Sequence, residues 1–175
     1  MNTANKLTML RVALIPVFLI LLYLRFPFHM YFALTVFILA SVTDFVDGYI
    51  ARHYNQVTDF GKFMDPLADK VLVMAALLWF VEAGRLPAWV LLVVIVREFA
   101  VTALRLIAVE RGRVIAAAWS GKVKTASTMV CIVLMLIPPV AREISSLCVA
   151  VIVLTTIYSG VEYFIKNLDV LSGTK

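Results

Sequence analysis

The sequence predicts an all-α, polytopic membrane protein with six transmembrane helices, from its composition and from the length of its apolar runs. Apolar residues make up 63% of the chain and charged residues only 15%. Water-soluble domains average roughly 45–50% apolar and about 25% charged residues. Since a membrane-spanning helix needs about 20 apolar residues, six spans would use most of the 175 residues. We therefore expect a single membrane domain over residues 1–175, without a separate soluble domain.

Six apolar runs define the predicted helices in order. The first shows no small-residue cleavage pattern after it, so we expect it to be retained in the mature protein. A short connection joins the second and third runs, which carry aspartates where they adjoin it, and Arg97 lies inside the fourth run. The fifth and sixth contain Cys131 and Cys148, which we interpret as packing residues rather than a disulfide or metal site. The predicted spans are residues 8–24, 31–50, 65–82, 87–108, 124–140 and 144–166.

The basic residues predict the orientation of these spans. An even number of spans places both chain ends on one side, and most of the 16 lysines and arginines fall on that side. The positive-inside rule then places both termini and the 2/3 and 4/5 connections in the cytoplasm. We expect a multi-pass protein of the cytoplasmic membrane with its site facing the cytosol. The net charge of +5 is assigned to topology and anionic membrane lipids, and no nucleic-acid partner is expected.

Four aspartates cluster around the connection between the second and third spans. Asp44 and Asp47 lie three residues apart, and Asp65 and Asp69 four apart, so each pair shares one helix face. A short connection makes the two helices antiparallel neighbours, which would bring all four carboxylates together near the membrane surface. The structural alternative is that these aspartates cap helices, lie in solvent or pair with nearby basic residues.

Divalent metal ions would relieve the repulsion among four carboxylates in a medium of low dielectric constant. All-oxygen ligands favour Mg²⁺ or Mn²⁺ over zinc. Two ions bridged by aspartates would also bind a pyrophosphate and stabilise the attacking and leaving oxygens of a phosphoryl transfer. Gly48 and Ala51 fall on the same face as the first two aspartates, where small residues leave room for a ligand.

The spacing of these residues resembles the signature of the CDP-alcohol phosphatidyltransferase family. The family pattern is Asp-x2-Asp-Gly-x2-Ala-Arg-x8-Gly-x3-Asp-x3-Asp. The sequence matches it without a departure at Asp44, Asp47, Gly48, Ala51, Arg52, Gly61, Asp65 and Asp69. The resemblance extends to the opening segment 5–11, to segment 97–105 in the fourth span and to segments 121–125 and 159–164. These additions are similar to family members that use glycerol 3-phosphate as the acceptor.

The resemblance implies a reaction and a set of roles. The phosphatidyl group of CDP-diacylglycerol would pass to an acceptor hydroxyl, with release of CMP, and the enzyme would be a homodimer. Asp44, Asp47 and Asp65 would bind the two metal ions, while Asp69 would act as general base and touch one metal. The CDP-lipid would contact a further group of residues. That group is Asp47, Gly48, Ala51, Arg52, Gly61, Asn5 and Thr8.

Basic residues of the fourth and fifth spans inform the choice of acceptor. Arg97, Arg105, Lys122 and Lys124 are predicted on the cytoplasmic side, or within a span, near the level of the aspartates. An acceptor with its own phosphate needs such cations, whereas serine would not, so they favour glycerol 3-phosphate. The alternative is that these basic residues only set the membrane topology and contact lipid headgroups. Arg97 is the hardest of the four to explain in that way, although pairing with Glu98 could be purely structural.

Other functions fit the sequence less well. A sibling transferase would use the same metal motif with inositol phosphate or phosphatidylglycerol as the acceptor. A cation or proton transporter would need carboxylates along a path, but the aspartates gather on one side. A scaffold without chemistry would leave the four clustered acids unexplained.

Overall fold

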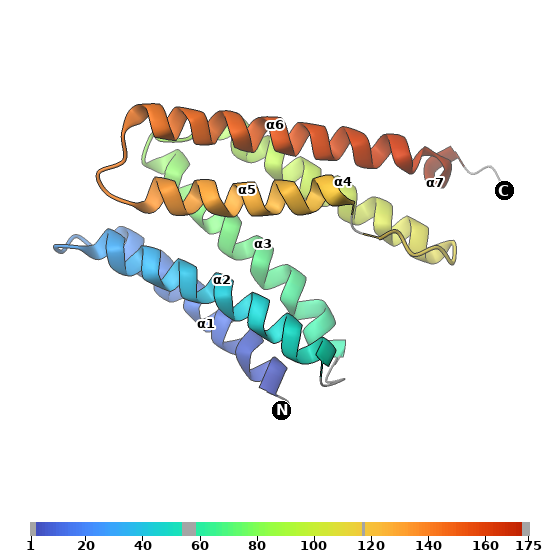
Figure 1. Cartoon of the computed structure of the whole chain (residues 1–175), viewed down its shortest axis with the longest axis horizontal. Helices are drawn as coiled ribbons and strands as arrows, with labels where there is room; N and C mark the ends of the chain where they lie inside the picture. The colour runs from blue at the N-terminus through green and yellow to red at the C-terminus, as the bar shows by residue number, and fades with distance from the viewer. Residues whose placement is uncertain (1–2, 54–58, 117, 173–175) are drawn as a thin grey trace. The chain divides into compact units, whose positions relative to one another are not determined.

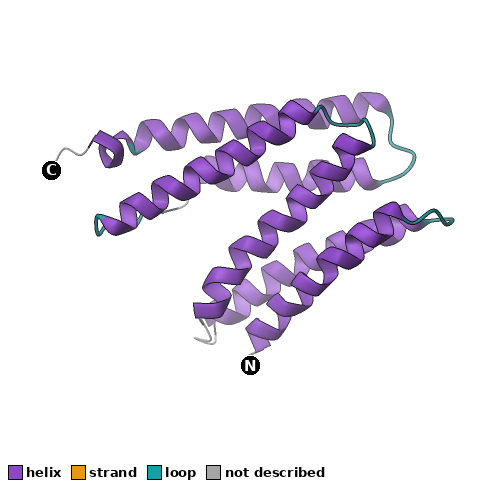
Figure 2. Ribbon diagram, turned by 180° about the vertical axis from the view of Figure 1, so that it is seen from behind, coloured by secondary structure: helices purple, strands orange, loops and turns teal. Residues whose placement is uncertain are grey.

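The computed structural model describes the backbone of residues 3–53, 59–116 and 118–172, and the side chains of residues 7–43, 64, 66–116 and 118–170. Within these ranges every regular element is a helix (Figures 1 and 2). The helices are α1 (Thr3–Tyr23), α2 (His29–His53), α3 (Asp59–Glu82), α4 (Ala88–Glu110), α5 (Trp119–Leu136), α6 (Arg142–Lys166) and α7 (Leu168–Ser172). The prediction of an all-α fold is confirmed, and each predicted span overlaps one of the long helices.

The helices differ from the predicted spans in several places. α1, α3 and α5 begin at Thr3, Asp59 and Trp119, five or six residues before the predicted starts at 8, 65 and 124. α5 ends at Leu136, whereas the fifth span was predicted to reach residue 140. Pro138 and Pro139 follow, and proline lacks the N–H that a continuing helix needs. The short helix α7, which packs through Val170 against Ala108 and Tyr163, was not predicted because it is too short to show a helical period.

One described helix, α6, is long and apolar enough to cross a membrane by length and composition, with a mean hydropathy of 2.0 over its most apolar stretch. Leu7–Tyr23 and His29–Thr43 are shorter apolar helical stretches. α4 has the length for a span, but Arg97, Glu98 and Arg105 interrupt its apolar run. The six-span topology therefore remains a prediction.

The chain divides into two compact units, and the first contains Met1–Phe80 and Ile132–Val140. Here α1 and α2 pack against each other. Ala33, Phe37 and Ala40 recur along α2 at helical spacing and are fully buried. The ring of Phe37 packs on that of Phe18 in α1, with centroids 5.6 Å apart. Such an aromatic pair contributes about 0.5–1.5 kcal/mol beyond its area burial. The first half of the acidic motif thus extends from a well-packed helix.

The second unit contains Val81–Cys131 and Ala141–Lys175. α4 packs against α6 and α7. Hydrogen bonds between side chains connect α5 to both long neighbours, through Lys124 to α4 and Ser127 to α6. The buried side of α6 becomes polar toward its C-terminal end, because Thr156, Ser159 and Tyr163 follow Ile152 at helical spacing. Polar groups are therefore built into the interior of this unit.

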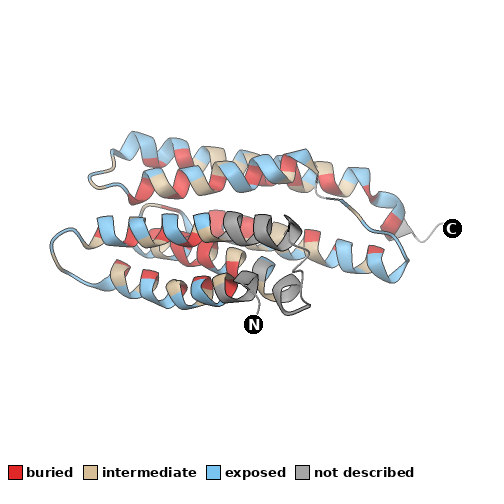
Figure 3. Ribbon diagram, turned by 60° about the horizontal axis from the view of Figure 1, so that its bottom comes forward, coloured by how far each residue is buried: buried red, intermediate tan, exposed pale blue. Residues whose placement is uncertain are grey.

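The outward faces of the long helices are strongly apolar. In Figure 3 the described parts of these helices carry buried residues on one side and exposed residues on the other. On α4 and α6 the exposed side includes Leu92, Phe99, Leu106, Leu147 and Leu154, which are 59–67% exposed. Water-soluble monomers rarely expose so much contiguous apolar surface. The pattern is typical of helices that face lipid.

Candidate functional site

The acidic motif is divided between two helices of the first unit. Positions 44 and 47 belong to α2, which continues without interruption to His53, and positions 65 and 69 belong to α3. The helical backbone that the spacing argument requires is therefore present on both sides of the connection. Most motif side chains lie outside the described residues. They are those of Asn5, Asp44, Asp47, Gly48, Ala51, Arg52, Gly61 and Asp65.

Asp69 is the one motif aspartate whose side chain is described. It is half-buried on α3, directly after Ala68, which is 2% exposed. No group of three or more acidic, histidine or cysteine side chains gathers among the described residues. The donor set of the complete motif nevertheless fits Mg²⁺ or Mn²⁺, because it offers four carboxylates and no thiolate. The four aspartates remain the residues predicted to hold the metal.

At the start of α1 the structure buries two polar residues. Thr8, predicted to contact the CDP-lipid, is 1% exposed, and Arg11, one turn further along, is fully buried. The sequence analysis missed Arg11 as a site candidate. The signal was available, since a charged residue inside an apolar run is costly unless it is paired, and the same signal identified Arg97.

In the second unit, two of the four predicted acceptor-site residues meet on a single acid. Glu98 Oε1 accepts hydrogen bonds from Arg97 Nη1 at 2.9 Å and from Lys124 Nζ at 2.7 Å. The side chains are 12%, 15% and 5% exposed in the order Arg97, Glu98, Lys124. Taken by themselves, these three described side chains carry a net charge of +1 and are largely buried. An anion entering this cluster would be stabilised by charge and by hydrogen bonds.

Two glycines make room for the Arg97 side chain. A Cβ at Gly121 of α5 would lie 3.4 Å from Arg97 Nη2, and one at Gly160 of α6 would lie 3.3 Å from Arg97 Cγ. The side chain of Arg97 is therefore closely enclosed by α5 and α6. Its Nε is buried and has no hydrogen-bond partner among the described residues. A buried donor without a partner is unfavourable, so this arrangement of the guanidinium carries an energetic cost.

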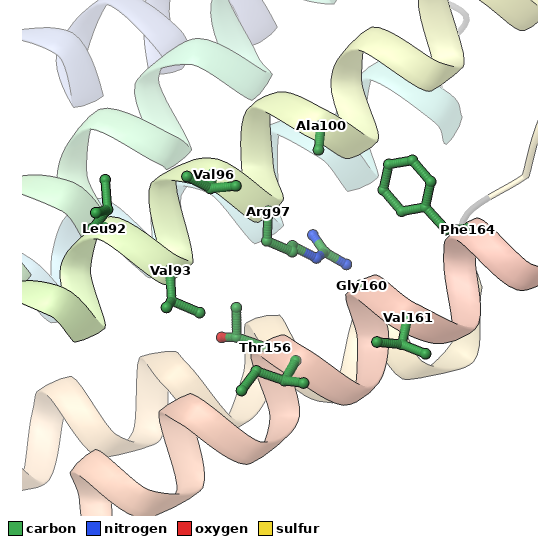
Figure 4. A pocket seen from close by; sticks show the side chains of 10 residues that line it. Leu92, Val93, Val96, Arg97, Ala100, Thr156, Gly160, Val161 and Phe164 are labelled. Carbon is green, nitrogen blue, oxygen red and sulfur yellow. The ribbon is translucent and has the colours of Figure 1, made fainter. Parts of the chain in front are cut away.

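A groove of about 420 Å³ lies between α4 and α6 and includes Arg97 in its lining. Figure 4 shows the Arg97 side chain extending from α4 across this space, near Gly160 and toward Phe164. The other lining side chains are apolar except for Thr156, whose Oγ1 is also buried without a partner in the described part of the chain. The groove thus has apolar walls, and the two polar atoms, Arg97 Nε and Thr156 Oγ1, are buried rather than open to it.

The other two predicted acceptor-site residues are arranged differently. Arg105 donates from Nε to the hydroxyl of Tyr163 at 2.8 Å, and its guanidinium carbon lies 5.4 Å from the centre of that ring. Tyr163 therefore holds Arg105 in an exposed position on α4. Lys122 is exposed on α5, and positions two apart on a helix do not share a face, so it lies on a different side from buried Lys124. Sequence reasoning assigned no role to Tyr163.

Comparisons with known proteins agree with the resemblance found in the sequence. The profile of the family described as CDP-alcohol phosphatidyltransferase matches residues 1–158. A Bacillus subtilis protein named CDP-diacylglycerol–glycerol-3-phosphate 3-phosphatidyltransferase is 44% identical over 188 aligned positions, which cover 97% of each chain. A Mycobacterium tuberculosis protein named probable phosphatidylglycerophosphate synthase is 39% identical over 180 positions, covering 99% of this chain and 85% of the relative. A Pseudomonas fluorescens protein with the same name as the first is 43% identical over 149 positions, covering 81% and 75%.

Proposed function

The chain belongs to the CDP-alcohol phosphatidyltransferase family, and we propose that it transfers the phosphatidyl group of CDP-diacylglycerol to glycerol 3-phosphate. The products are phosphatidylglycerophosphate and CMP, and the reaction is the committed step of phosphatidylglycerol synthesis. The observation that carries the choice of acceptor is the buried pair of cations, Arg97 and Lys124, held on one oxygen of Glu98. The similarity to relatives named for this reaction, over nearly the whole chain, supports the same choice.

We assign the donor to the acidic motif. Asp44, Asp47 and Asp65 would hold two Mg²⁺ or Mn²⁺ ions, with Asp69 also in reach of one of them. When bound, such ions neutralise a pyrophosphate and its departing oxygen. The CDP-lipid would be bound by a group of surrounding residues. That group is Asp47, Gly48, Ala51, Arg52, Gly61, Asn5 and Thr8.

Asp69 is the proposed general base. A primary alcohol is a weak nucleophile near neutral pH, so a carboxylate must accept its proton as the new bond forms. The acceptor oxygen bonds to the phosphorus of the phosphatidyl group, the proton passes to Asp69, and the bond between that phosphorus and the CMP oxygen breaks. The half-buried position of Asp69 on α3 suits this role, because partial burial restricts competing water.

We assign the acceptor phosphate to the basic residues of the second unit. Arg97 and Lys124 form its centre, because they are buried, adjacent and share one acid. Arg97 Nη1 and Lys124 Nζ, which now donate to Glu98 Oε1, are the nitrogens proposed to contact the phosphate. Arg105 and Lys122 would add positive charge from exposed positions. A phosphate group can accept hydrogen bonds from several such donors at once, whereas serine or a neutral alcohol brings no phosphate to balance their positive charge.

The setting of the site is also proposed. Six membrane spans with both termini in the cytoplasm would place the site on the cytoplasmic side of the cell membrane, where CDP-diacylglycerol lies in the leaflet and glycerol 3-phosphate arrives from the cytosol. Membrane lipids would cover the apolar outer faces of α4 and α6, and the enzyme would act as a homodimer.

Release of CMP by the purified, detergent-solubilised protein tests the proposal. The protein is incubated with CDP-diacylglycerol and Mg²⁺, and serine, inositol, inositol phosphate, phosphatidylglycerol and glycerol 3-phosphate are offered in separate reactions. We expect CMP release when glycerol 3-phosphate is the acceptor and none with the other acceptors. Addition of EDTA should abolish this release. CMP release with a different acceptor would agree with the proposed metal chemistry but would show that glycerol 3-phosphate is not the acceptor. No release with any acceptor would reject the proposed function.

A further inference from the structure

Glu98 is a largely buried acid with two basic partners, in a part of the chain where a binding site for an anion is proposed. We infer that Glu98 is a positioning residue, which holds Arg97 and Lys124 side by side for the acceptor phosphate without touching the substrate itself. This inference rests on the proposed function, because it assigns a role within the proposed acceptor site.

The geometry of the contacts supports a positioning role. Both cations donate to the same oxygen, Glu98 Oε1, at 2.9 Å and 2.7 Å. Nitrogens that share one acceptor atom must lie close to each other, so a single phosphate group can contact both side chains. Glu98 and Arg97 are consecutive on α4, whereas Lys124 comes from α5, so the acid links two helices at this point.

The charge of the cluster supports the same role. Arg97 and Lys124 would repel each other in a site that is at most 15% exposed if no acid lay between them. Glu98 offsets one of the two positive charges and keeps the site stable when it is empty. The remaining net charge of +1 still favours an anion.

Restricting two long side chains before binding also improves affinity. Free lysine and arginine side chains lose rotamer freedom when they bind a ligand, and this loss weakens binding. Here Glu98 holds the nitrogen ends of both side chains, and Gly121 and Gly160 leave only a narrow space around Arg97. The acceptor site is therefore largely formed before the substrate arrives.

The substitution Glu98→Gln tests the role, because glutamine keeps the shape of the side chain and removes its charge. We expect the KM for glycerol 3-phosphate to rise about tenfold or more, as expected when a binding interaction rather than the chemical step is weakened. The KM for CDP-diacylglycerol should stay within about twofold of its original value. Calorimetric titration of glycerol 3-phosphate into the protein without CDP-lipid should show a matching loss of affinity.

Asp169→Asn is the matched control, because it removes the acid of an ion pair with Arg113 that is exposed and distant in sequence from Glu98. We expect this variant to keep both KM values and the affinity for glycerol 3-phosphate. Should Glu98→Gln fail to fold, Glu98→Asp retains the charge but shortens the reach to Lys124. That variant should raise the KM for the acceptor and leave the KM for the CDP-lipid unchanged.

Three results would overturn the inference. An unchanged KM and affinity for glycerol 3-phosphate in Glu98→Gln would show that Arg97 and Lys124 do not need Glu98 to position them. A parallel rise of both KM values with a fall in kcat would identify Glu98 as a structural link between α4 and α5. A parent protein that releases CMP only with another acceptor would reject the proposed function and this inference together, whereas the first two results leave the proposed function intact.

Discussion

Replacing Lys124 by methionine is the most direct test of the acceptor site. Methionine keeps an unbranched, apolar side chain of similar length, so the substitution removes little more than the charged end group. Lys124 is suited to this test because its side chain is only 5% exposed and its Nζ contacts Glu98 Oε1 at 2.7 Å. Both the stability of the fold and the binding of the acceptor should respond.

The contacts allow the two effects to be estimated. In Lys124→Met, Glu98 keeps its hydrogen bond from Arg97 at 2.9 Å. The cost to the fold should thus be that of one charge-assisted hydrogen bond, about 1.5–3 kcal/mol. This is less than the about 3–5 kcal/mol expected when a buried charge loses its only partner. The loss of one such bond to the acceptor phosphate, about 2 kcal/mol, corresponds to a fall of about 30-fold in kcat/KM.

Steady-state CMP release, with each substrate varied in turn, measures the effect on binding. We expect kcat/KM for glycerol 3-phosphate to fall by that factor and the KM for CDP-diacylglycerol to stay within about twofold. Lys166→Met is the matched control, because it makes the same change in a lysine that pairs with Glu162 but is 63% exposed. Equal effects of the two substitutions, or an unchanged kcat/KM in Lys124→Met, would refute the assignment of Lys124 to the acceptor phosphate.

Three further predictions concern the base and the surroundings of Arg97. Asp69→Asn should abolish turnover and largely spare binding of the CDP-lipid, measured by titration; equal loss of both would mean that Asp69 is mainly a metal ligand. Arg105→Ala should raise the KM for glycerol 3-phosphate several-fold. Tyr163→Phe removes only the hydroxyl that accepts a hydrogen bond from Arg105 at 2.8 Å, so it should cause a smaller rise. An unchanged KM in Arg105→Ala would exclude Arg105 from the acceptor site. Gly160→Val should raise the same KM about tenfold by displacing Arg97, whose Cγ would lie 3.3 Å from a new Cβ; a KM equal to that of the parent protein would show that the enclosure of Arg97 is unimportant.

The helices could be predicted from the sequence because each apolar run is long and the breaks between runs are clear. Pro87 and Pro139 lie at or beside the ends of the runs, and the described helices begin or end within a few residues of them. The end of α5 was predicted too late, because hydropathy does not register that a pair of prolines stops a helix. Hydropathy also could not reveal α7, because its Val170 belongs to a buried cluster with Leu104 and Ala108 of α4, which are distant in sequence.

The candidate site was predictable to the extent that its residues form a local pattern. The aspartates of the acidic motif lie within residues 44–69, and their spacing alone places them on two helices. The acceptor cluster is different, because Glu98 and Lys124 are separated by 26 residues and meet only through the packing of α4 and α5. A spacing rule within one helix cannot predict such a contact. Arg11 was missed for a different reason, because it was counted only among the basic residues that set the topology although it lies inside an apolar run.

The enclosure of Arg97 has a consequence for the design of altered substrate specificity. Its side chain extends from α4 into a space bounded by Gly121 of α5 and Gly160 of α6. A bulkier group at position 97 would lack room, and a smaller one would leave a void and remove one hydrogen bond to Glu98. In a library of variants that changes only position 97, most substituted side chains would therefore fit poorly in a space that matches arginine. If Arg97 binds the acceptor as proposed, positions 97, 121 and 160 on three helices should be varied together.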